Sequence, residues 1–355
     1  MPRIRSIKLA DSKSKTRVRL ALVGGETLLG KELEDVLENR PAGATILSFA
    51  ATGEGNFGEV EGEAVYVEPL AEKTIRDVRA LLIAGSPEGA RKAYDLAKAA
   101  DGHPPVIDCT GQLENQPEAR IVAPLVSEAQ EGGNPVGRSW LLVLAHPAAT
   151  ALALALKRLA RHGKLKRVIA HVFEPASERG ERGISELHEQ TASLLSFKPL
   201  KKEVFDTQQS YNLLPEYGED AAEKLAGIEQ RVERHLATLF SSDRTLAEVP
   251  MPSLRVIGAP VFHGYSLSLW VEFEKDVNAQ ELGEALASAQ IEVRGPQEEP
   301  PDNVGAAGQS GLQAGNIRVD RNNAHAAWFW IVADNLRLTA EAAADLVRTL
   351  EAEPA

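Results

Sequence analysis

The chain has 355 residues, which at about 150 residues per domain predicts two domains. Its formal net charge of −12 argues against a nucleic-acid or membrane partner, because both favour basic protein surfaces. Cys109 is the only cysteine, so a disulfide framework, a paired-cysteine redox motif and a multi-cysteine zinc site are excluded. No apolar run reaches the roughly 18 residues of a membrane span, and residues 1–16 form a basic segment without the apolar core of a secretory signal. We therefore expect a flexible tail over 1–16 and a cytoplasmic protein.

The first half of the chain alternates short apolar strands with helices. The segment RVRLALVGGETLLGKELE (17–34) predicts a buried strand, a glycine turn and a helix. The pattern continues as strands, with one helix at 87–101, over 44–51, 78–85 and 104–111. Such alternation is typical of a parallel α/β sheet, which we expect over residues 17–140.

The pattern changes after residue 140. A strand, turn and helix over 141–163 lead to two long, partly alternating strands at 167–175 and 259–274, as in antiparallel sheets covered on one face. An amphipathic helix is predicted at 218–240 and a Gly/Pro-rich loop at 295–315. We expect a mixed α/β domain over 141–335, with the last helix (336–355) completing the first domain.

The turn GGETLLG is a candidate dinucleotide site. Its glycines would let backbone amides approach a phosphate at the helix N-terminus, although Thr27 stands at the close-approach position. A tight strand–helix turn without a ligand explains the same residues. The candidate cofactor residues in this turn are Gly24, Gly25, Glu26, Thr27, Leu28, Leu29 and Gly30.

Six segments taken together are more specific than any one of them. In order they are GGETLLG, VIDCTGQLENQPEARIVAPLVS, LAHPAATALALAL, VFEPASERGERGISEL, APVFHGYSLSLWVEF and VADNLR. Their order and spacing resemble the aspartate-semialdehyde dehydrogenase family from about residue 17 to 350. The resemblance implies an N-terminal Rossmann domain and a mixed α/β domain for catalysis and dimerisation. It also implies NADPH-dependent reduction of an acyl phosphate, with a cysteine nucleophile, a histidine acid/base, a glutamine and two substrate-binding arginines.

The catalytic positions implied by this resemblance carry other residues. Ala148 stands at the nucleophile and Tyr265 at the acid/base, while Glu174 replaces the glutamine. Gly258 and Glu114 stand where the family has its substrate arginines. A methyl group forms no thioester, a tyrosine with a pKa near ~10 is a poor proton shuttle at neutral pH, and a carboxylate repels a phosphate.

Four neighbouring residues offer alternatives. His146 and His263 are more simply read as structural histidines, and Arg255 could reach toward the Gly258 position. Cys109 is either a relocated nucleophile or a buried small side chain, of which we favour the second. No HxxxH, HExxH or paired His/Cys spacing is present, so no metal site is expected.

The cofactor half is also altered. The segment AATGEGNFGE after the second strand has no Arg or Lys for a 2′-phosphate, and Glu26 would add repulsion near the phosphates. Asn335 is retained in the DNLR segment. NADP and NAD are the candidate cofactors, and we expect weak binding with no advantage for NADP.

These substitutions favour a homodimeric, non-catalytic member of the family that binds an unidentified small molecule or regulates a partner. The alternatives are an active NAD(P)-dependent semialdehyde dehydrogenase with substituted catalytic groups, and a different reaction on the same scaffold.

Overall fold

The computed structural model describes residues 18–39, 44–52, 54–60, 63–127 and 139–352. Its first half is built on a six-stranded sheet of order β2-β1-β5-β6-β8-β7, in which every neighbouring pair is parallel. The strands are short and almost wholly apolar, as expected for strands buried on both faces. They are β1 (Val18–Val23), β2 (Ala44–Phe49), β5 (Ala80–Ile83), β6 (Val106–Asp108), β7 (Ala119–Val122) and β8 (Leu141–Leu144).

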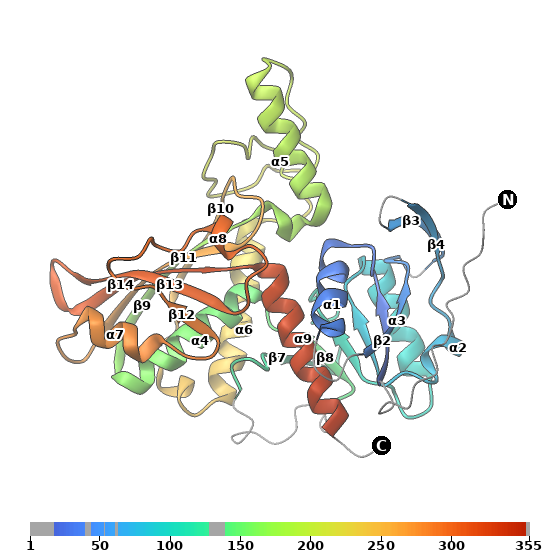
Figure 1. The fold of residues 1–355 in the computed structure, drawn as a ribbon, viewed down its shortest axis with the longest axis horizontal. Coiled ribbons are helices and arrows are strands. Elements are labelled where there is room, and N and C mark those ends of the chain that lie inside the picture. The colour runs from blue at the N-terminus through green and yellow to red at the C-terminus, as the bar shows by residue number, and fades with distance from the viewer. Residues whose placement is uncertain (1–17, 40–43, 53, 61–62, 128–138, 353–355) are drawn as a thin grey trace.

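Helices cover both faces of this sheet (Figure 1). On one face α1 (Leu28–Glu38) and the C-terminal helix α9 (Asn335–Ala352) pack on Leu20, Leu22 and Leu82. On the other face α3 (Pro87–Ala99) and the short α2 (Glu72–Ile75) cover Ala21, Val23 and Ile83. The last helix of the chain thus completes the core of the first half.

The second half contains a mixed six-stranded sheet of order β10-β9-β11-β14-β13-β12. Its two outer pairs, β10–β9 and β12–β13, are parallel, and its three inner pairs are antiparallel. The strands are β9 (Leu165–Glu174), β10 (Ser253–Gly258), β11 (Tyr265–Phe273), β12 (Ile291–Val293), β13 (Leu312–Asp320) and β14 (Asn323–Ala333). One face packs on α4 (Pro147–His162), α6 (Leu225–Ser242) and α7 (Ala279–Leu286).

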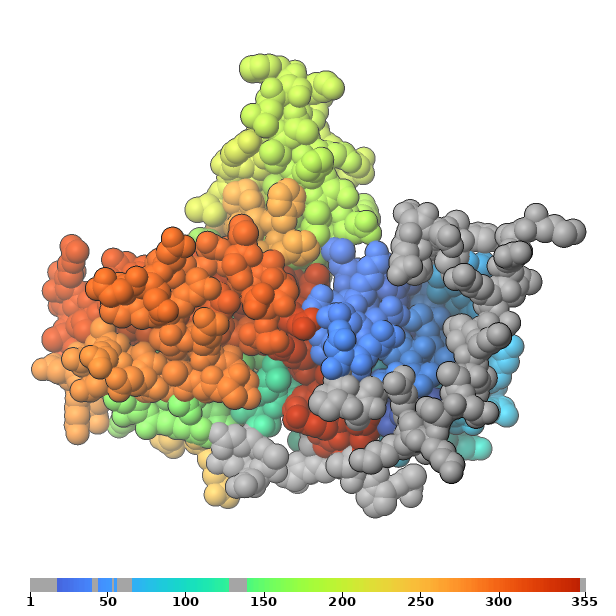
Figure 2. Space-filling model, viewed as in Figure 1, coloured from blue at the N-terminus to red at the C-terminus, as the bar shows by residue number. Residues whose placement is uncertain are grey.

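The remaining elements include a projecting arm. The helix α5 (Gly180–Leu195) and the chain returning from it stand clear of the body (Figure 2). The others are small: a β3–β4 hairpin (Asn56–Val60 and Glu63–Val67), the 3₁₀ turns η2 (Ala176–Arg179) and η3 (Leu246–Glu248), and α8 (Asn303–Ala306). No helix within the described part of the chain is long and apolar enough to cross a bilayer.

The expected fold class, a parallel α/β sheet followed by a mixed α/β unit, is confirmed. Three details differ from the expectation. The strand β8 pairs with β6 and β7, so the first sheet extends past the expected boundary at 140. The segment 295–315 is not all loop, because it contains α8 and the start of β13. The β3–β4 hairpin was not expected from the sequence, and the tail over 1–16 lies outside the described residues.

Candidate functional site

The candidate site lies where α4 begins, directly after the buried strand β8. His146 caps the helix and Pro147 occupies its first turn, a position that needs no backbone donor. Ala148 follows with no exposed surface. The backbone amide of Ala148 donates to Nδ1 of His146 at 3.3 Å. The position expected to hold the nucleophile therefore carries only a buried methyl group, because its residue is an alanine with no exposed surface.

Two histidines continue this arrangement into α6. The backbone amide of His146 donates to Nδ1 of His235 at 2.8 Å. That contact leaves Nε2 of His235 as the protonated nitrogen, which donates to Glu114 at 2.9 Å. Burial, together with the nearby His235 and Arg231, holds the pKa of His146 well below its usual range. His146 is therefore a neutral, structural helix cap at physiological pH.

Glu114 is enclosed by cations from α6. Its carboxylate accepts from Arg231 Nε at 3.3 Å and from Arg234 at 3.0 Å, besides His235. Burial opposes its ionisation, but the His235 hydrogen bond and the two arginines prevail and lower the pKa of Glu114 to about 2. Glu114 is thus a stable anion whose charge is met by this chain's own arginines.

The loop that carries Glu114 is held by Asp108 at the end of β6. The buried Asp108 carboxylate accepts from the amides of Thr110 at 2.8 Å, Gly111 at 3.1 Å and Leu113 at 2.8 Å, and from the Thr110 hydroxyl at 2.7 Å. These bonds fold the DCTG segment into a tight turn. Glu114 is positioned by that turn.

A chain of ion pairs links Glu114 to the end of β9. Arg231 also approaches Glu223 at 3.7 Å, Glu223 pairs with Arg179, and Arg179 lies 2.5 Å from Glu174. Glu174 has no exposed surface, and burial raises its pKa to about 7 against the opposing charge of Arg179. An ion-pair network, buried at Glu174 and partly exposed at Glu223 and Arg231, therefore runs from the first sheet through α6 to the second sheet.

Tyr217 fills the space beside Gly258. A Cβ on Gly258 would lie 2.8 Å from Cε1 of Tyr217 and 3.3 Å from Oε1 of Gln209. The Tyr217 hydroxyl donates to Glu174 at 3.2 Å, which fixes the ring. Arg255 is exposed on β10 and, three residues from Gly258, points to the opposite face of the strand. The alternative that Arg255 reaches toward the Gly258 position is therefore wrong.

Tyr265 lies against the helix cap. Its ring centroid is 5.9 Å from that of His146, and only 1% of the residue is exposed. Burial and the nearby Glu178 raise the pKa of Tyr265 well above its usual range, so the phenol stays protonated at neutral pH. The structure brings Ala148, Glu114, Glu174, Gly258 and Tyr265 into this one region. Among the described residues, the hydrogen bond seen for His263 is at its backbone carbonyl, which accepts from Asn303.

Asn335 joins three segments at the start of α9. Its side-chain oxygen Oδ1 accepts from Ser177 Oγ and from the Gly264 backbone amide, each at 3.1 Å, and its side-chain nitrogen Nδ2 donates to Glu178 at 2.8 Å. Only 1% of the residue is exposed. Asn335, expected as a cofactor residue, has both atoms of its amide group engaged within the protein.

The glycine turn after β1 is as tight as its sequence suggests. Gly24 has φ +94°, and a Cβ on Gly30 would collide with the carbonyl oxygen of Gly24. Thr27 Oγ1 accepts from the Gly30 amide at 3.0 Å and so caps α1. Leu28 and Leu29 begin the helix. The turn is well formed, and its threonine hydroxyl is used within it.

Glu26 lies elsewhere than expected, whereas Cys109 is buried in the core, the alternative that we favoured from the sequence. The Glu26 carboxylate turns to the end of β2, where Oε1 accepts from the Ala51 amide at 2.8 Å. Cys109 packs in the core beneath α9, with its thiol 3.8 Å from the Ile107 carbonyl, and burial raises its pKa well above the usual range. Cys109 therefore lacks the properties of a reactive thiol.

The residues of α6 that contact Glu114 were not expected from the sequence. Arg231, Arg234 and His235 recur at i, i+3 and i+4 on α6, a spacing that places them on one helix face. That signal was readable, but its target was not, because Glu114 lies 117 residues before Arg231. Within the described residues no cluster of His, Cys, Asp and Glu could hold a metal ion.

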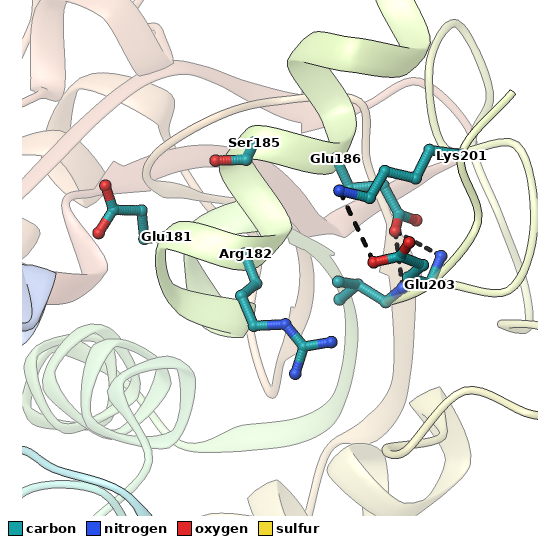
Figure 3. A pocket seen from close by; sticks show the side chains of 7 residues that line it. Glu181, Arg182, Ser185, Glu186, Lys201 and Glu203 are labelled. Atoms are coloured by element: carbon teal, nitrogen blue, oxygen red, sulfur yellow. Dashed lines mark hydrogen bonds and ion pairs between the residues drawn. The ribbon is translucent and has the colours of Figure 1, made fainter.

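A separate pocket of about 340 Å³ lies at the base of the arm. It is lined by Glu181, Arg182, Ser185, Glu186, Lys201, Glu203 and Val204. Figure 3 shows Lys201 directed at Glu203 and Glu186 turned toward the returning chain. This pocket does not share a residue with the ion-pair network that links Glu114 to Glu174.

Known proteins resemble the chain over nearly its whole length. Residues 156–338, more than half of the chain, match the family described as semialdehyde dehydrogenase, dimerisation domain. A USG-1 protein homolog from Azotobacter vinelandii is 28% identical over 90% of this chain and 93% of that protein. An aspartate-semialdehyde dehydrogenase from Aquifex aeolicus is also 28% identical, with the same coverage.

The solved structures agree with these relatives. A probable aspartate-semialdehyde dehydrogenase from Pseudomonas aeruginosa superimposes with a TM-score of 0.79 at 26% identity, over 95% of this chain and 99% of that one. The enzyme from Candida albicans, determined with NADP, has a TM-score of 0.61 at 11% identity, over 94% and 98% of the two chains, and so shares the fold alone.

Proposed function

The chain belongs to the semialdehyde dehydrogenase family, and we propose that it is a homodimeric member that does not catalyse the family's reaction and acts by binding or regulation. The family's mechanism needs a thiolate, an acid/base and two cationic substrate groups together. In this proposal Ala148, Tyr265, Gly258 and Glu114 stand at those four positions. Losing all four at once leaves no part of the acyl-transfer chemistry in place.

The observation that carries this proposal is the start of α4. Ala148 presents a buried methyl group, and the nearest titratable ring, His146, is neutral and capped onto the Ala148 amide. No thiol replaces it nearby, because Cys109 belongs to the core beneath α9. An acyl group would find no nucleophile at this helix.

The substrate-holding positions support the same conclusion. A phosphate approaching Glu114 would have to compete with that carboxylate for Arg231 and Arg234. A carboxylate approaching Gly258 would meet the Tyr217 ring. Each cation of the network already faces a carboxylate of this chain, so an anionic substrate would have to displace one, although Arg179 Nε and Glu174 Oε2 make no hydrogen bond to a described residue.

A dinucleotide could still be held at the glycine turn. Gly24 and Gly30 allow close approach, and the amides of Gly25 and Glu26 have no hydrogen bond to a described residue that would keep them from a phosphate. When bound, a nicotinamide cofactor supplies hydride transfer. We propose weak binding there, because Thr27 occupies the helix cap and the segment 50–60, directly after β2, contains no Lys or Arg.

The second copy would pack on the open face of the second sheet. That face carries Phe173, Trp270, Trp328 and Trp330, with Trp270 directly opposite Trp328, and Trp328 remains 37% exposed. An aromatic row opposite the helix-covered face is typical of an interface. The dimerisation-domain match supports a copy of the same chain as the occupant.

An enzymatic assay tests the proposal. Purified protein, shown to unfold cooperatively, is incubated with aspartate semialdehyde, phosphate or arsenate, and NADP or NAD. We expect no reduction of NADP or NAD above the blank. Ala148→Cys should not restore activity, since Tyr265, Gly258 and Glu114 are unchanged in that variant. Turnover that survives Cys109→Ala would overturn the proposal, and turnover abolished by it would make Cys109 the nucleophile. Thermal-shift screening with the same compounds then searches for the bound ligand.

A further inference from the structure

We infer that Glu26 makes the glycine turn selective for a dinucleotide without a 2′-phosphate, so that NAD binds in preference to NADP. The inference concerns the cofactor site alone and stands whether or not the protein turns over a substrate. From the sequence alone, the Glu26 carboxylate was expected to lie near the phosphates of a bound dinucleotide.

The Glu26 carboxylate lies at the end of the second strand instead. Oε1 accepts from the backbone amide of Ala51, two residues after β2 ends at Phe49, at 2.8 Å. The carbonyl of Ala51 accepts in turn from the Ser86 amide at 2.9 Å, before α3. The carboxylate is thus fixed between the β1–α1 turn and the end of β2, by a segment that is itself tied to the next turn.

One oxygen of this carboxylate is left without a partner. Oε2 of Glu26 is buried and makes no hydrogen bond to any described residue. A buried carboxylate oxygen without a donor is unusual, since buried polar atoms are nearly always satisfied. A ligand hydroxyl would satisfy this oxygen once the Glu26 side chain turned to expose it, because Oε2 has almost no accessible surface in this structure.

The geometry of parallel α/β folds says which hydroxyl this is. A dinucleotide places its pyrophosphate at the N-terminus of the helix after the first strand and its adenine ribose at the end of the second strand. An acidic side chain there accepts from the 2′-hydroxyl of NAD and repels the 2′-phosphate of NADP. In this chain the acid comes from the turn itself rather than from the end of β2, but its carboxylate reaches the same place.

The charged groups described around Glu26 are mainly carboxylates. Glu34 lies nearby on α1, where its carboxylate accepts from Ser48 of β2. Burial raises the pKa of Glu34, and the charges of Glu38 and Glu26 add to that effect. Glu54, also after β2, is paired with Lys92. A 2′-phosphate would therefore add its charge beside two carboxylates, with the neighbouring lysine already paired to a third.

Isothermal calorimetry with NAD and NADP tests the inference without using activity. We expect NAD to bind at least about tenfold more tightly than NADP, a ratio within the range of one charged hydrogen bond gained or lost. The pair 5′-AMP and adenosine 2′,5′-bisphosphate, which differ only in the 2′-phosphate, should show the same order. This places the discrimination at the ribose and not at the nicotinamide.

Three variants assign the effect to Glu26. Glu26→Gln should bring the two affinities within about threefold, and Glu26→Arg should reverse the preference. Glu38→Gln, at the exposed far end of α1, removes the same charge from the helix that follows the turn and should leave the ratio unchanged. Equal or tighter binding of NADP by the wild-type protein would refute the inference, as would binding of neither dinucleotide at about 1 mM. These wild-type measurements decide the matter even if a Glu26 variant fails to fold.

Discussion

Glu114 is a residue through which the two halves of the chain are coupled electrostatically. Its loop follows β6 of the first sheet, and its three partners come from α6, which packs on the second sheet. The Glu114 side chain is nearly buried, while Arg231 is partly exposed and Arg234 is exposed. Removing an enclosed charge costs more than the pair itself contributes, because the groups that remain lose their partner. The stability of the domain contact should therefore depend on this carboxylate and on its ionisation.

The first prediction is that Glu114→Gln destabilises the protein by about 2 kcal/mol at neutral pH. The pKa of Glu114 is about 2 in the folded protein against an ordinary 4.5, so its contribution is complete above about pH 4.5 and is lost as the pH falls toward 2. Urea unfolding from pH 7 to pH 3 measures the difference, which should shrink with acidity. Glu219→Gln, at an exposed carboxylate, is the control. A difference independent of pH would contradict the assignment.

The second prediction concerns Gly258. Gly258→Ala should cost about 1–3 kcal/mol, because the new methyl meets the Tyr217 ring, which is fixed by its bond to Glu174. The penalty should fall by at least about 1 kcal/mol in a Tyr217→Ala background, as a double-mutant cycle would show.

Gly283→Ala supplies the opposite case. A Cβ on Gly283 meets only Ile317 and Val293, each at 3.6 Å, in the middle of α7. This substitution should be neutral or stabilise by up to about 1 kcal/mol, from helix propensity alone. Similar effects at the two glycines would argue against a specific clash at Gly258.

Among the secondary-structure elements, the arm consists of helix α5 and the irregular segment that follows it, and side-chain hydrogen bonds hold the two together. Glu186 on α5 is buried, and its carboxylate accepts from three successive amides, those of Glu203 at 2.6 Å, Val204 at 2.7 Å and Phe205 at 3.2 Å. One turn later, Gln190 accepts from the amides of Gln209 and Ser210. Two polar side chains thus do what strand pairing does elsewhere, satisfying a backbone that has no sheet to join.

The third prediction follows from this. In Glu186→Ala, tryptic cleavage after Lys201 and Lys202 should be accelerated about tenfold or more, since three amides lose a charged acceptor. Glu189→Ala, on the same helix, removes only the exposed pair with Lys201 and should change the rate little. Time-resolved mass spectrometry of the digest gives both rates. Equal rates in the two variants would show that Glu186 does not hold the segment.

At the scale of the whole molecule, the second sheet has one covered face and one aromatic face. Trp270 and Trp328 both direct Nε1 to Asp320, at 2.7 and 3.1 Å, which orders their rings side by side. Ile169 on β9 extends the same face and is 39% exposed. A face of this composition is stabilised when a second copy covers it.

The fourth prediction is that the wild-type protein is a dimer and Trp328→Lys a monomer at micromolar concentration, because the substitution places a charge within an apolar interface. Light scattering after size-exclusion chromatography measures the mass. Tyr66→Lys, at a residue of β4 that is 54% exposed on the first half, is the control and should remain dimeric. A wild-type monomer would remove the dimer from the proposed function.

The fold class and most of the elements could be predicted from the amino-acid sequence, but the β3–β4 hairpin and α8 could not. The apolar runs of β1, β5 and β6 and the alternation of β9 and β11 are local patterns, and the period of such patterns follows from strand and helix geometry. The substitutions at Ala148 and Gly258 were equally readable, because they are identities at single positions. What these residues contact was not readable in the same way.

The long-range contacts that complete the site could be seen only in the folded chain. Glu114 meets Arg231, and Glu26 meets Ala51, across 117 and 25 residues of chain. Such pairings depend on how sheets and helices pack, and side-chain direction over long separations has no periodic signal in the sequence. For the same reason the sequence suggested that Glu26 lies over the phosphates, whereas the fold turns its carboxylate to the second strand. Local geometry is encoded locally, but the electrostatics of a site are set by residues that only folding brings together.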